Sequence, residues 1–446
     1  MEFKRKIYKD LLEWKNEENK NSALLIEGAR RVGKTTIVKE FAKKEYKNHI
    51  YIDFTYATDD IKKLFSRINP ANSLSMDQFF SDLFLFTGKT LNKGDLIIFD
   101  EVQHFPKARQ AIKALVYDGR FDYIETGSLI SIRENTQDIQ IPSEERRIEM
   151  HPMDFEEFCW AFGWDNKCEL LRSIYNEHRT ISESVHNQLM DDFRLYLALG
   201  GMPKVVSLYQ ETNSFMRCEK EKQDILKLYE DDLRRHDDKS KTQTLNIYNS
   251  MLPALKSWSK RVKTNTRNNQ MVQSYQRSLK DLEDSKVVNA VYRTEDLSFG
   301  TFMKEENSFK LYPLDSGLML SGLIGDTNED SESTYIKIRT GKLEGANLGT
   351  LYETLVIDSL VCNSRRAFYH TFEYNEKRYE IDFICFIKGK MTAIEVKSTN
   401  RFTASSLSTL KLKYPQLKFN KIIVSPKNLS YDDQITYLPI YMTFLL

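Results

Sequence analysis

Residues 23–41, ALLIEGARRVGKTTIVKEF, contain an apolar run, a loop with two glycines and the start of an amphipathic segment. The central part, GARRVGKTT, fits the phosphate-loop pattern GxxxxGK[ST], in which glycines let backbone N–H groups wrap around phosphates. A helix that follows such a loop directs its positive end at the same phosphates. The stretch therefore predicts a strand, a nucleotide-binding loop and a helix, with these loop residues: Gly28, Ala29, Arg30, Arg31, Val32, Gly33, Lys34, Thr35 and Thr36.

Two side chains at the end of this loop have specific expected tasks. Lys34 is expected to reach the β- and γ-phosphates of ATP, and the Thr35 hydroxyl is expected to ligate Mg²⁺. The apolar run before the loop and the helical pattern after it supply the context that the short motif requires. ATP and Mg²⁺ are therefore the predicted cofactors.

A second apolar run, LIIFDE (96–101), ends in two acids. In open α/β sheets, ligands bind at the carboxyl ends of the strands, so Asp100 and Glu101 are expected beside the nucleotide. Asp100 is predicted to hold Mg²⁺, and Glu101 to polarise the attacking water. The alternative is an exposed strand end without a catalytic task.

Two further motifs leave alternatives open. ETGS (125–128) ends another apolar run, and Thr126 or Ser128 is expected either to contact the γ-phosphate or the water, or to cap a helix. SEERRIEM contains Arg146 and Arg147, which are candidates for an arginine finger that reaches a neighbouring subunit or for salt bridges.

Apolar runs and helical patterns alternate through the first third of the chain. The candidate strands are residues 23–28, 49–54, 95–101 and 121–128, and the clearest helical patterns between them are 35–46 and 107–118. Such alternation predicts a parallel sheet with helices on both faces.

The spacing of apolar residues changes after residue 150. Residues 152–250 have helical spacing, interrupted by the Gly-Gly and Pro of LGGMPKVV (199–206). The sequence pattern of residues 250–325 predicts a small helical unit that ends in a pair of strands. The polar, acidic stretch GDTNEDSESTY (325–335) is the best linker candidate, and residues 336–446 return to helix, strand and helix.

Several motifs together resemble a known family. GARRVGKTT, IIFDEVQHFPKARQAIKAL, ETGS, HPMDFEEF, LALGGMPKVV and YPLDSGL occur in the order found in a widespread group of prokaryotic AAA-type ATPases. The resemblance covers about residues 20–400. It implies an ATPase core, a winged-helix segment and a restriction-endonuclease-like C-terminal domain. One departure is Ala29, because many relatives have proline there.

The resulting expectation is an α/β protein with four parts. Residues 1–150 are expected to form a P-loop ATPase core on a parallel sheet, and 151–245 a helical lid. Residues 246–325 are expected to form a winged-helix-like segment, and 336–446 a restriction-endonuclease-like α/β domain.

The C-terminal stretch YEIDFICFIKGKMTAIEVKS (379–398) places three charges in two apolar strands. A two-residue turn at Gly389-Lys390, of type II′, would put Asp382 opposite Lys397 and Ile384 opposite Glu395. Because side chains alternate along a strand, Asp382, Glu395 and Lys397 are then expected on one face. The preceding helical pattern, 345–360, carries Glu353 as a further carboxylate.

This set of residues matches the pattern of PD-(D/E)xK nucleases, a Glu, an Asp and then Glu-x-Lys. Carboxylate oxygens of Asp382 and Glu395 are expected to bind Mg²⁺, while Lys397 assists attack on a phosphodiester and Glu353 contributes to catalysis. Two alternatives remain: a salt bridge on a solvated face, and a nuclease-like fold that binds DNA or regulates without cleaving.

Charge is distributed unevenly in a chain of 446 residues with a net charge of +1. Residues 388–427 contain nine Lys or Arg and one acid, and residues 253–293 contain nine basic residues and three acids. Both stretches suit contacts with DNA phosphates, with residues 274–284 as a recognition helix, although solvated faces would have the same composition.

The five cysteines form no CxxC pair and no cluster with zinc spacing, which indicates a reducing compartment. No apolar segment suggests a signal peptide or a membrane span, so we expect a cytoplasmic protein without a membrane partner. The favoured function is ATP-dependent action on nucleic acid. The alternative is an ATP-driven switch that controls a partner protein through a non-cleaving C-terminal domain. A homo-oligomer is compatible with either.

Overall fold

The computed structural model describes residues 3–65, 68, 73–127, 143–236, 243–257, 260–261, 269–295, 297, 302–325, 331–343, 346–432 and 434–446. The chain folds into two compact units. Unit 1 comprises Met1–His151 with Asp284–Lys286, and unit 2 comprises Pro152–Glu283 with Val287–Leu446. The predicted limits near residues 245 and 325 both fall inside unit 2, and the finer division there stays a prediction.

Unit 1 is built on a five-stranded parallel sheet with the order β2-β3-β4-β1-β5. This confirms the predicted parallel sheet. The four apolar runs are four of its strands, and the fifth strand was not predicted because its sequence, ERRIE, is charged. The strands are β1 (Ala23–Glu27), β2 (His49–Asp53), β3 (Leu96–Asp100), β4 (Asp122–Gly127) and β5 (Glu145–Glu149).

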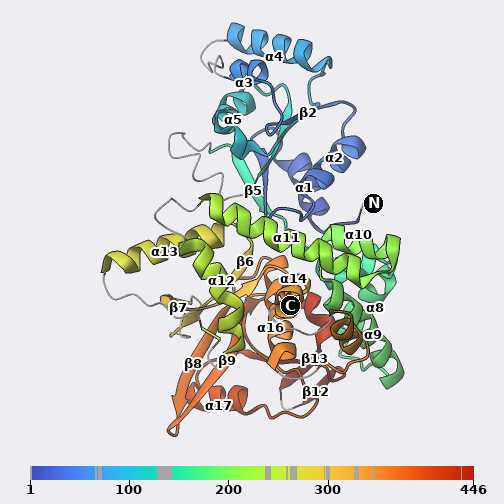
Figure 1. The fold of residues 1–446 in the computed structure, drawn as a ribbon, viewed down its shortest axis with the longest axis vertical. Coiled ribbons are helices and arrows are strands. Elements are labelled where there is room, and N and C mark those ends of the chain that lie inside the picture. Colours follow the sequence, from blue (N-terminus) through green and yellow to red (C-terminus); the bar gives the residue numbers. More distant parts are fainter. Residues whose placement is uncertain are drawn as a thin grey trace. The chain divides into compact units, whose positions relative to one another are not determined.

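Helices cover both faces of this sheet (Figure 1). Phe99 and other residues of one face pack with α3, α4 and α5 in a single apolar cluster. Residues of the opposite parity, such as Ile26 and Ile98, are fully buried as well, and α2 contacts β3 and β4. The helices are α1 (Ile7–Glu17), α2 (Lys34–Glu45), α3 (Asp59–Phe65), α4 (Ser73–Thr87) and α5 (Pro106–Asp118), with the short η1 (Val102–His104).

Unit 2 begins with helices, as the apolar spacing predicts, and continues into a mixed α/β part. Its helices are α7 (Phe155–Ala161), α8 (Asp165–Asn176), α9 (Glu183–Leu199), α10 (Pro203–Thr212), α11 (Phe215–His236), α12 (Gln243–Lys256), α13 (Asn269–Asp284), α14 (Ser316–Gly325), α15 (Ser331–Arg339), α16 (Ala346–Cys362), α17 (Ser405–Lys413) and η2 (Ile440–Leu445). Its strands are β6 (Val288–Thr294), β7 (Lys304–Pro313), β8 (Phe368–Tyr374), β9 (Lys377–Ile387), β10 (Lys390–Val396), β11 (Asn420–Ser425), β12 (Ser430–Asp432) and β13 (Ile435–Pro439).

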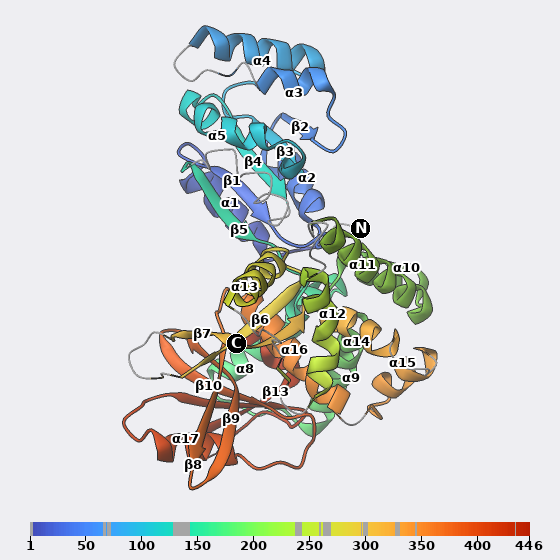
Figure 2. The same cartoon turned by 60° about the vertical axis from the view of Figure 1, so that its left-hand side comes forward.

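These strands form one eight-stranded sheet with the order β12-β13-β11-β10-β9-β8-β6-β7. Strands β8, β9 and β10 pair antiparallel, and β11 returns parallel to β10 after α17, which packs against β9 (Figures 1 and 2). The predicted strand pair, β6 and β7, joins the same sheet because β6 pairs with β8. The predicted helices and strands therefore follow in this order, but the hairpin is part of the C-terminal sheet, and the winged-helix-like segment stays a prediction.

The linker prediction is wrong in part. Residues 326–330 lie outside the described residues, but residues 331–335 form the first part of α15, where Thr334 and Tyr335 are buried. The buried side chains of Thr334, Tyr335 and Ile338 stabilise α15, which includes this part of the polar stretch. Both flanking helices, α14 and α15, belong to unit 2.

Two motifs that are far apart in the sequence meet in unit 2. Gly200 and Gly201 end α9, and Asp315 begins the turn into α14. The Asp315 carboxylate accepts hydrogen bonds from Gly201 N at 2.6 Å and from Leu318 N at 2.9 Å. A Cβ on Gly317 would lie 2.3 Å from Leu199 O. Close backbone contact therefore explains why both motifs contain glycine.

Candidate functional site

The predicted nucleotide loop connects β1 to α2 in unit 1. Gly28 has φ 155° and Gly33 has φ 106°, and Arg31 is left-handed as well, with φ 70°. A Cβ on Gly28 would lie 2.3 Å from Met150 O, so the close approach of the chain after β5 requires glycine there. Arg5 donates from Nη1 to Val32 O at 2.8 Å and thereby fixes the outer part of the loop.

Lys34 turns its ammonium group back into this loop. Its Nζ donates to Gly28 O at 2.8 Å and to Ala29 O at 2.9 Å, and the side chain is buried. Burial lowers the pKa of Lys34 to about 8, although the negative charges of Glu101 and Asp100 oppose the shift. The negative charges of these two acids act on Lys34, so the end of β3 lies near the loop that follows β1.

Asp100, the last residue of β3, accepts hydrogen bonds from three hydroxyl groups. Thr35 donates to Oδ2 at 2.9 Å, Thr126 donates to Oδ1, and Tyr51 donates to Oδ2. Thr35 and Asp100 thus bring two hard oxygen donors together, which is the donor type that Mg²⁺ prefers, and these residues fit the predicted ion. Tyr51 on β2 was missed, because only the parallel pairing of β2 with β3 brings it beside Asp100.

Glu101, the predicted water-activating residue, follows Asp100 with a left-handed backbone, φ 54°. Gln103 donates from Nε2 to Glu101 Oε2. The backbone N–H of Glu101 donates to Thr126 Oγ1 at 3.3 Å. The side-chain amide of Gln103 therefore holds the Glu101 carboxylate. A water molecule or a nucleotide would have to displace this amide to reach the carboxylate.

The remaining predicted residues of unit 1 divide into two groups. Ser128 lies outside the described residues. Arg146 forms ion pairs with Glu18 and with Glu13, and Arg147 donates to Glu145 Oε1 at 2.8 Å. Both arginines thus make salt bridges within unit 1.

The charged strand β5 is stabilised by an arginine from α5. Arg109 forms two hydrogen bonds of 2.7 Å with the Glu145 carboxylate, and this pair is buried. Glu125 on β4 is fully buried nearby, and burial together with Glu145 raises the pKa of Glu125 well above its usual value. Glu125 is therefore part of the interior of the sheet.

The C-terminal hairpin exists, but its predicted register is wrong. Ile387 pairs with Lys390 and Phe383 pairs with Ile394, so the turn residues are Lys388 and Gly389. Both have positive φ, 49° and 74°, which defines a type I′ turn rather than type II′. Lys397 therefore does not lie opposite Asp382.

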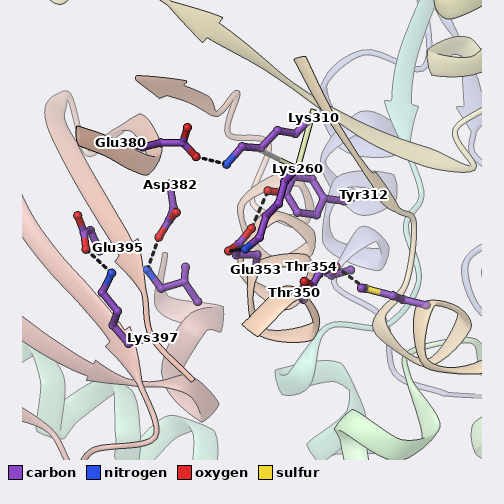
Figure 3. Close-up of polar contacts among 12 residues, drawn as sticks. Lys260, Lys310, Tyr312, Thr350, Glu353, Thr354, Glu380, Asp382, Glu395 and Lys397 are labelled. Carbon is purple, nitrogen blue, oxygen red and sulfur yellow. Dashed lines mark hydrogen bonds and ion pairs between the residues drawn. The ribbon is translucent and has the colours of Figure 1, made fainter. Parts of the chain in front are cut away.

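The shift in register keeps the three charges on one face. The observed pairing differs from the prediction by two residues, and side chains repeat with a period of two along a strand. Continued beyond Phe383, the same register places Asp382 opposite Glu395. Asp382 Oδ2 accepts a hydrogen bond from Val396 N at 2.8 Å, and Lys397 Nζ lies 2.6 Å from Glu395 Oε2 (Figure 3).

Electrostatics in this cluster keep Lys397 charged. Burial alone would lower the pKa of Lys397, but Glu395 and Asp382, with a smaller effect of Glu353, raise it above the usual lysine value. Burial and the neighbouring Asp382 raise the pKa of Glu395, while Lys397 opposes that shift. Lys397 can therefore offset negative charge here, but it is a poor general base.

Glu353 on α16 has partners that the sequence did not predict. Lys260, which follows α12, forms an ion pair with Glu353 Oε1, and the Tyr312 hydroxyl on β7 donates to Oε2 at 2.9 Å (Figure 3). Next to this group, Lys310 donates to Glu380 at 2.6 Å. These contacts bridge 41 to 93 positions in the sequence, so no local pattern could have indicated them.

The donor set fits a divalent cation only in part. Asp382 and Glu395 supply carboxylate oxygens, and both oxygens of Glu395 are buried. Glu353 does not complete the set, because Lys260 and Tyr312 hold both of its oxygens. Among the residues that the structure describes, no three Asp, Glu, His or Cys side chains gather to hold a metal ion.

The loop after β1 and the acids at the end of β3 have the arrangement of a P-loop nucleotide-binding site. In agreement, residues 20–159 match the family model described as AAA domain. Two other parts of the chain match models of domains of unknown function, DUF8612 at residues 190–329 and DUF4143 at residues 348–443. No curated protein matches the sequence.

Several solved structures resemble this chain, with low sequence identity and low TM-scores. A signal transduction ATPase with numerous domains and a tetratricopeptide repeat sensor, from Pyrococcus horikoshii, is 12% identical with a TM-score of 0.27, covering 82% of this chain and 50% of that chain. The chain thus spans half the length of that protein. Drosophila ORC bound to AT-rich DNA and Cdc6 is 12% identical (TM-score 0.24, 72% and 92% covered). Cdc6p from Pyrobaculum aerophilum is 13% identical (TM-score 0.22, 76% and 93% covered). Similarity at this level carries no functional argument.

A helix needs about 20 predominantly apolar residues to cross a bilayer. Within the described ranges, no helix combines the length and the apolar character needed to cross a bilayer.

Proposed function

We propose that unit 1 binds and hydrolyses ATP with Mg²⁺, and that this activity controls a C-terminal domain that binds and cleaves nucleic acid. The observation that carries the ATPase part is the convergence of Lys34, Thr35, Asp100 and Glu101 at one edge of a parallel sheet. Mg²⁺, held by Thr35 and Asp100, would neutralise charge on the phosphates.

The side chains of unit 1 have distinct tasks in this proposal. Lys34 exchanges the carbonyl groups of Gly28 and Ala29 for phosphate oxygens, which are better partners for an ammonium ion. Glu101 leaves Gln103 and orients the attacking water.

The proposed action on nucleic acid is supported by Asp382 and Glu395, which share one face of β9 and β10, and by Lys397, which follows β10 and pairs with Glu395. Asp382 and Glu395 would hold a divalent cation, which helps to form hydroxide from water. The charged Lys397 would stabilise the negative charge that develops on the attacked phosphate.

One observation favours the alternative of an ATP-driven switch with a C-terminal domain that does not cleave. Lys260 and Tyr312 occupy both oxygens of Glu353, and this leaves the carboxylate set incomplete. In that case the same face would bind a nucleic acid or a partner protein without cutting it.

The test combines both sites in the purified full-length chain. Lys34→Ala should abolish ATP binding, whereas Glu101→Gln should bind ATP but lose turnover by roughly a hundredfold or more. Asp382→Ala and Lys397→Ala should remove cleavage of DNA or RNA in Mg²⁺ or Mn²⁺ and retain salt-sensitive binding.

The outcomes separate the two functions. An active Glu101→Gln protein would contradict the role of Glu101. Binding without cleavage by the wild type would favour a nucleic-acid-binding domain, and the absence of both would favour the partner switch.

A further inference from the structure

At the C-terminal site, one carboxylate already pairs with a cation that belongs to the chain itself. Lys260 forms an ion pair with Glu353 Oε1, while Tyr312 donates to Oε2. Glu353 is buried on α16, and its oxygens are the kind of hard ligand that divalent cations prefer. A divalent cation that approaches Glu353 therefore has to displace an ammonium group that is already there.

The charges around this site are balanced when Lys260 is in place. The carboxylates are Glu353, Glu380, Asp382 and Glu395, and the cations that pair with them or act on them are Lys260, Arg261, Lys310 and Lys397. Such a cluster has little net attraction for a further positive ion. Removal of Lys260 would leave Glu353 without the cation that pairs with it, and a metal ion could neutralise that charge, whereas Glu380 would still pair with Lys310 if Arg261 were removed.

Lys260 and Lys310 differ in how easily they could leave. Lys310 has 0% side-chain exposure and is enclosed by β7 and its neighbours, whereas the Lys260 side chain is 25% exposed. Lys260 also has a left-handed backbone, φ 49°, a conformation that is unfavourable for a lysine. Of these two lysines, Lys260 therefore has access to water, and its backbone would gain from relaxation.

We propose that Lys260 competes with a divalent cation for Glu353, so that a metal ion can use this carboxylate only when Lys260 withdraws. The inference deepens the proposed function, because it concerns the same site and rests on its use of a metal ion. Lys260 is a positioning residue in this scheme, since it acts through Glu353 and touches no substrate.

The test is the affinity of the full-length, nucleotide-free chain for Mn²⁺, measured by calorimetry and electron paramagnetic resonance. Lys260→Gln should bind Mn²⁺ about tenfold more tightly than the wild type, because an opposing charge is removed. Lys260→Arg should show no such gain. Arg261→Gln is the matched control, because Arg261 pairs with Glu380 at 3.2 Å and not with Glu353.

Two more variants assign the gain to this site. Glu353→Gln added to Lys260→Gln should reverse the gain, and Asp382→Asn should remove the C-terminal Mn²⁺ binding while any binding in unit 1 persists. Thermal unfolding of each variant checks that the chain is folded.

The proposal is overturned if Lys260→Gln binds Mn²⁺ as the wild type does, or if Arg261→Gln gives an equal gain. A gain that survives Glu353→Gln overturns it as well. Tighter Mn²⁺ binding by Lys260→Gln without any nucleic-acid cleavage would reject the proposed nuclease activity and leave the competition at Glu353 intact.

Discussion

The ammonium group of Lys34 is buried before any nucleotide arrives. Burial lowers the pKa of Lys34 to about 8, compared with 10.5 in an unfolded chain. Between these values the unfolded chain binds more protons at this position than the folded chain does. The folded state therefore gains relative stability as the pH rises from 8 towards 10.5, because the cost of burying a charge disappears.

ATP binding should respond to pH in the opposite direction. Phosphates attract the charged form of Lys34, so ATP affinity should fall as the pH rises above about 8, by at most about tenfold per pH unit, with proton uptake on binding. Calorimetry between pH 7 and pH 9.5 in two buffers measures both quantities. Lys34→Arg is the control, because a guanidinium group stays charged and should remove the pH dependence. Equal affinity at pH 7 and pH 9.5 would contradict the prediction.

Local sequence patterns predicted the site residues that lie within a single motif. They did not predict the residues from other parts of the chain that contact those site residues. Lys34 and Asp100 were predicted because their motifs require them at fixed places. Tyr51 donates to Asp100 and Lys260 pairs with Glu353, but neither belongs to a motif. Such partners are selected by strand pairing and by long-range packing, and these are not encoded in the spacing of nearby residues.

At the scale of elements, β4 could be predicted from its local sequence, whereas β5 depends on contacts with distant residues. The apolar run of β4 predicts a buried strand, whereas β5 is a strand because Arg109 on α5 satisfies Glu145 and because β1 pairs with it. The hairpin of β9 and β10 was predicted with the right faces and the wrong register. An even shift preserves the face of every side chain, so the shared face of Asp382 and Glu395 did not depend on the turn type.

The contact between the end of α9 and the start of α14 gives a prediction for stability. A Cβ on Gly317 would lie 2.3 Å from Leu199 O and 2.7 Å from Gly200 Cα, and both of these are backbone atoms that cannot easily move. Gly317→Ala should therefore lower the free energy of unfolding by about 1–3 kcal/mol or more. Denaturant unfolding measures the change.

Gly325→Ala in the same helix is the matched control. A Cβ on Gly325 would meet nothing within 4 Å, and alanine is the better helix former, so this variant should be neutral or slightly stabilising. Equal stability of the two variants would mean that the backbones of α9 and α14 are free to separate.

At the scale of the whole chain, the sequence indicated a nucleotide-binding part and a second chemical site, each from its own motifs. The helices and strands of residues 250–325 were predicted as elements, but their membership in the C-terminal sheet was not. That membership depends on β6 pairing with β8, whose residues are more than 70 positions apart. Pairings over such a distance leave no periodic signal.

If ATP in unit 1 controls nucleic-acid binding in unit 2, the control must be reciprocal. A factor by which ATP changes the affinity for DNA equals the factor by which DNA changes the affinity for ATP. The variant with Glu101→Gln and Asp382→Ala should hold both ligands without consuming either. We expect a common factor of about fivefold or more, measured by DNA titrations with and without ATP and by ATP titrations with and without DNA. Adding Lys34→Ala should abolish the effect of ATP on DNA binding. DNA binding that is salt-sensitive but unaffected by ATP would show that the two sites act independently, and the ATPase would then have to act on another partner.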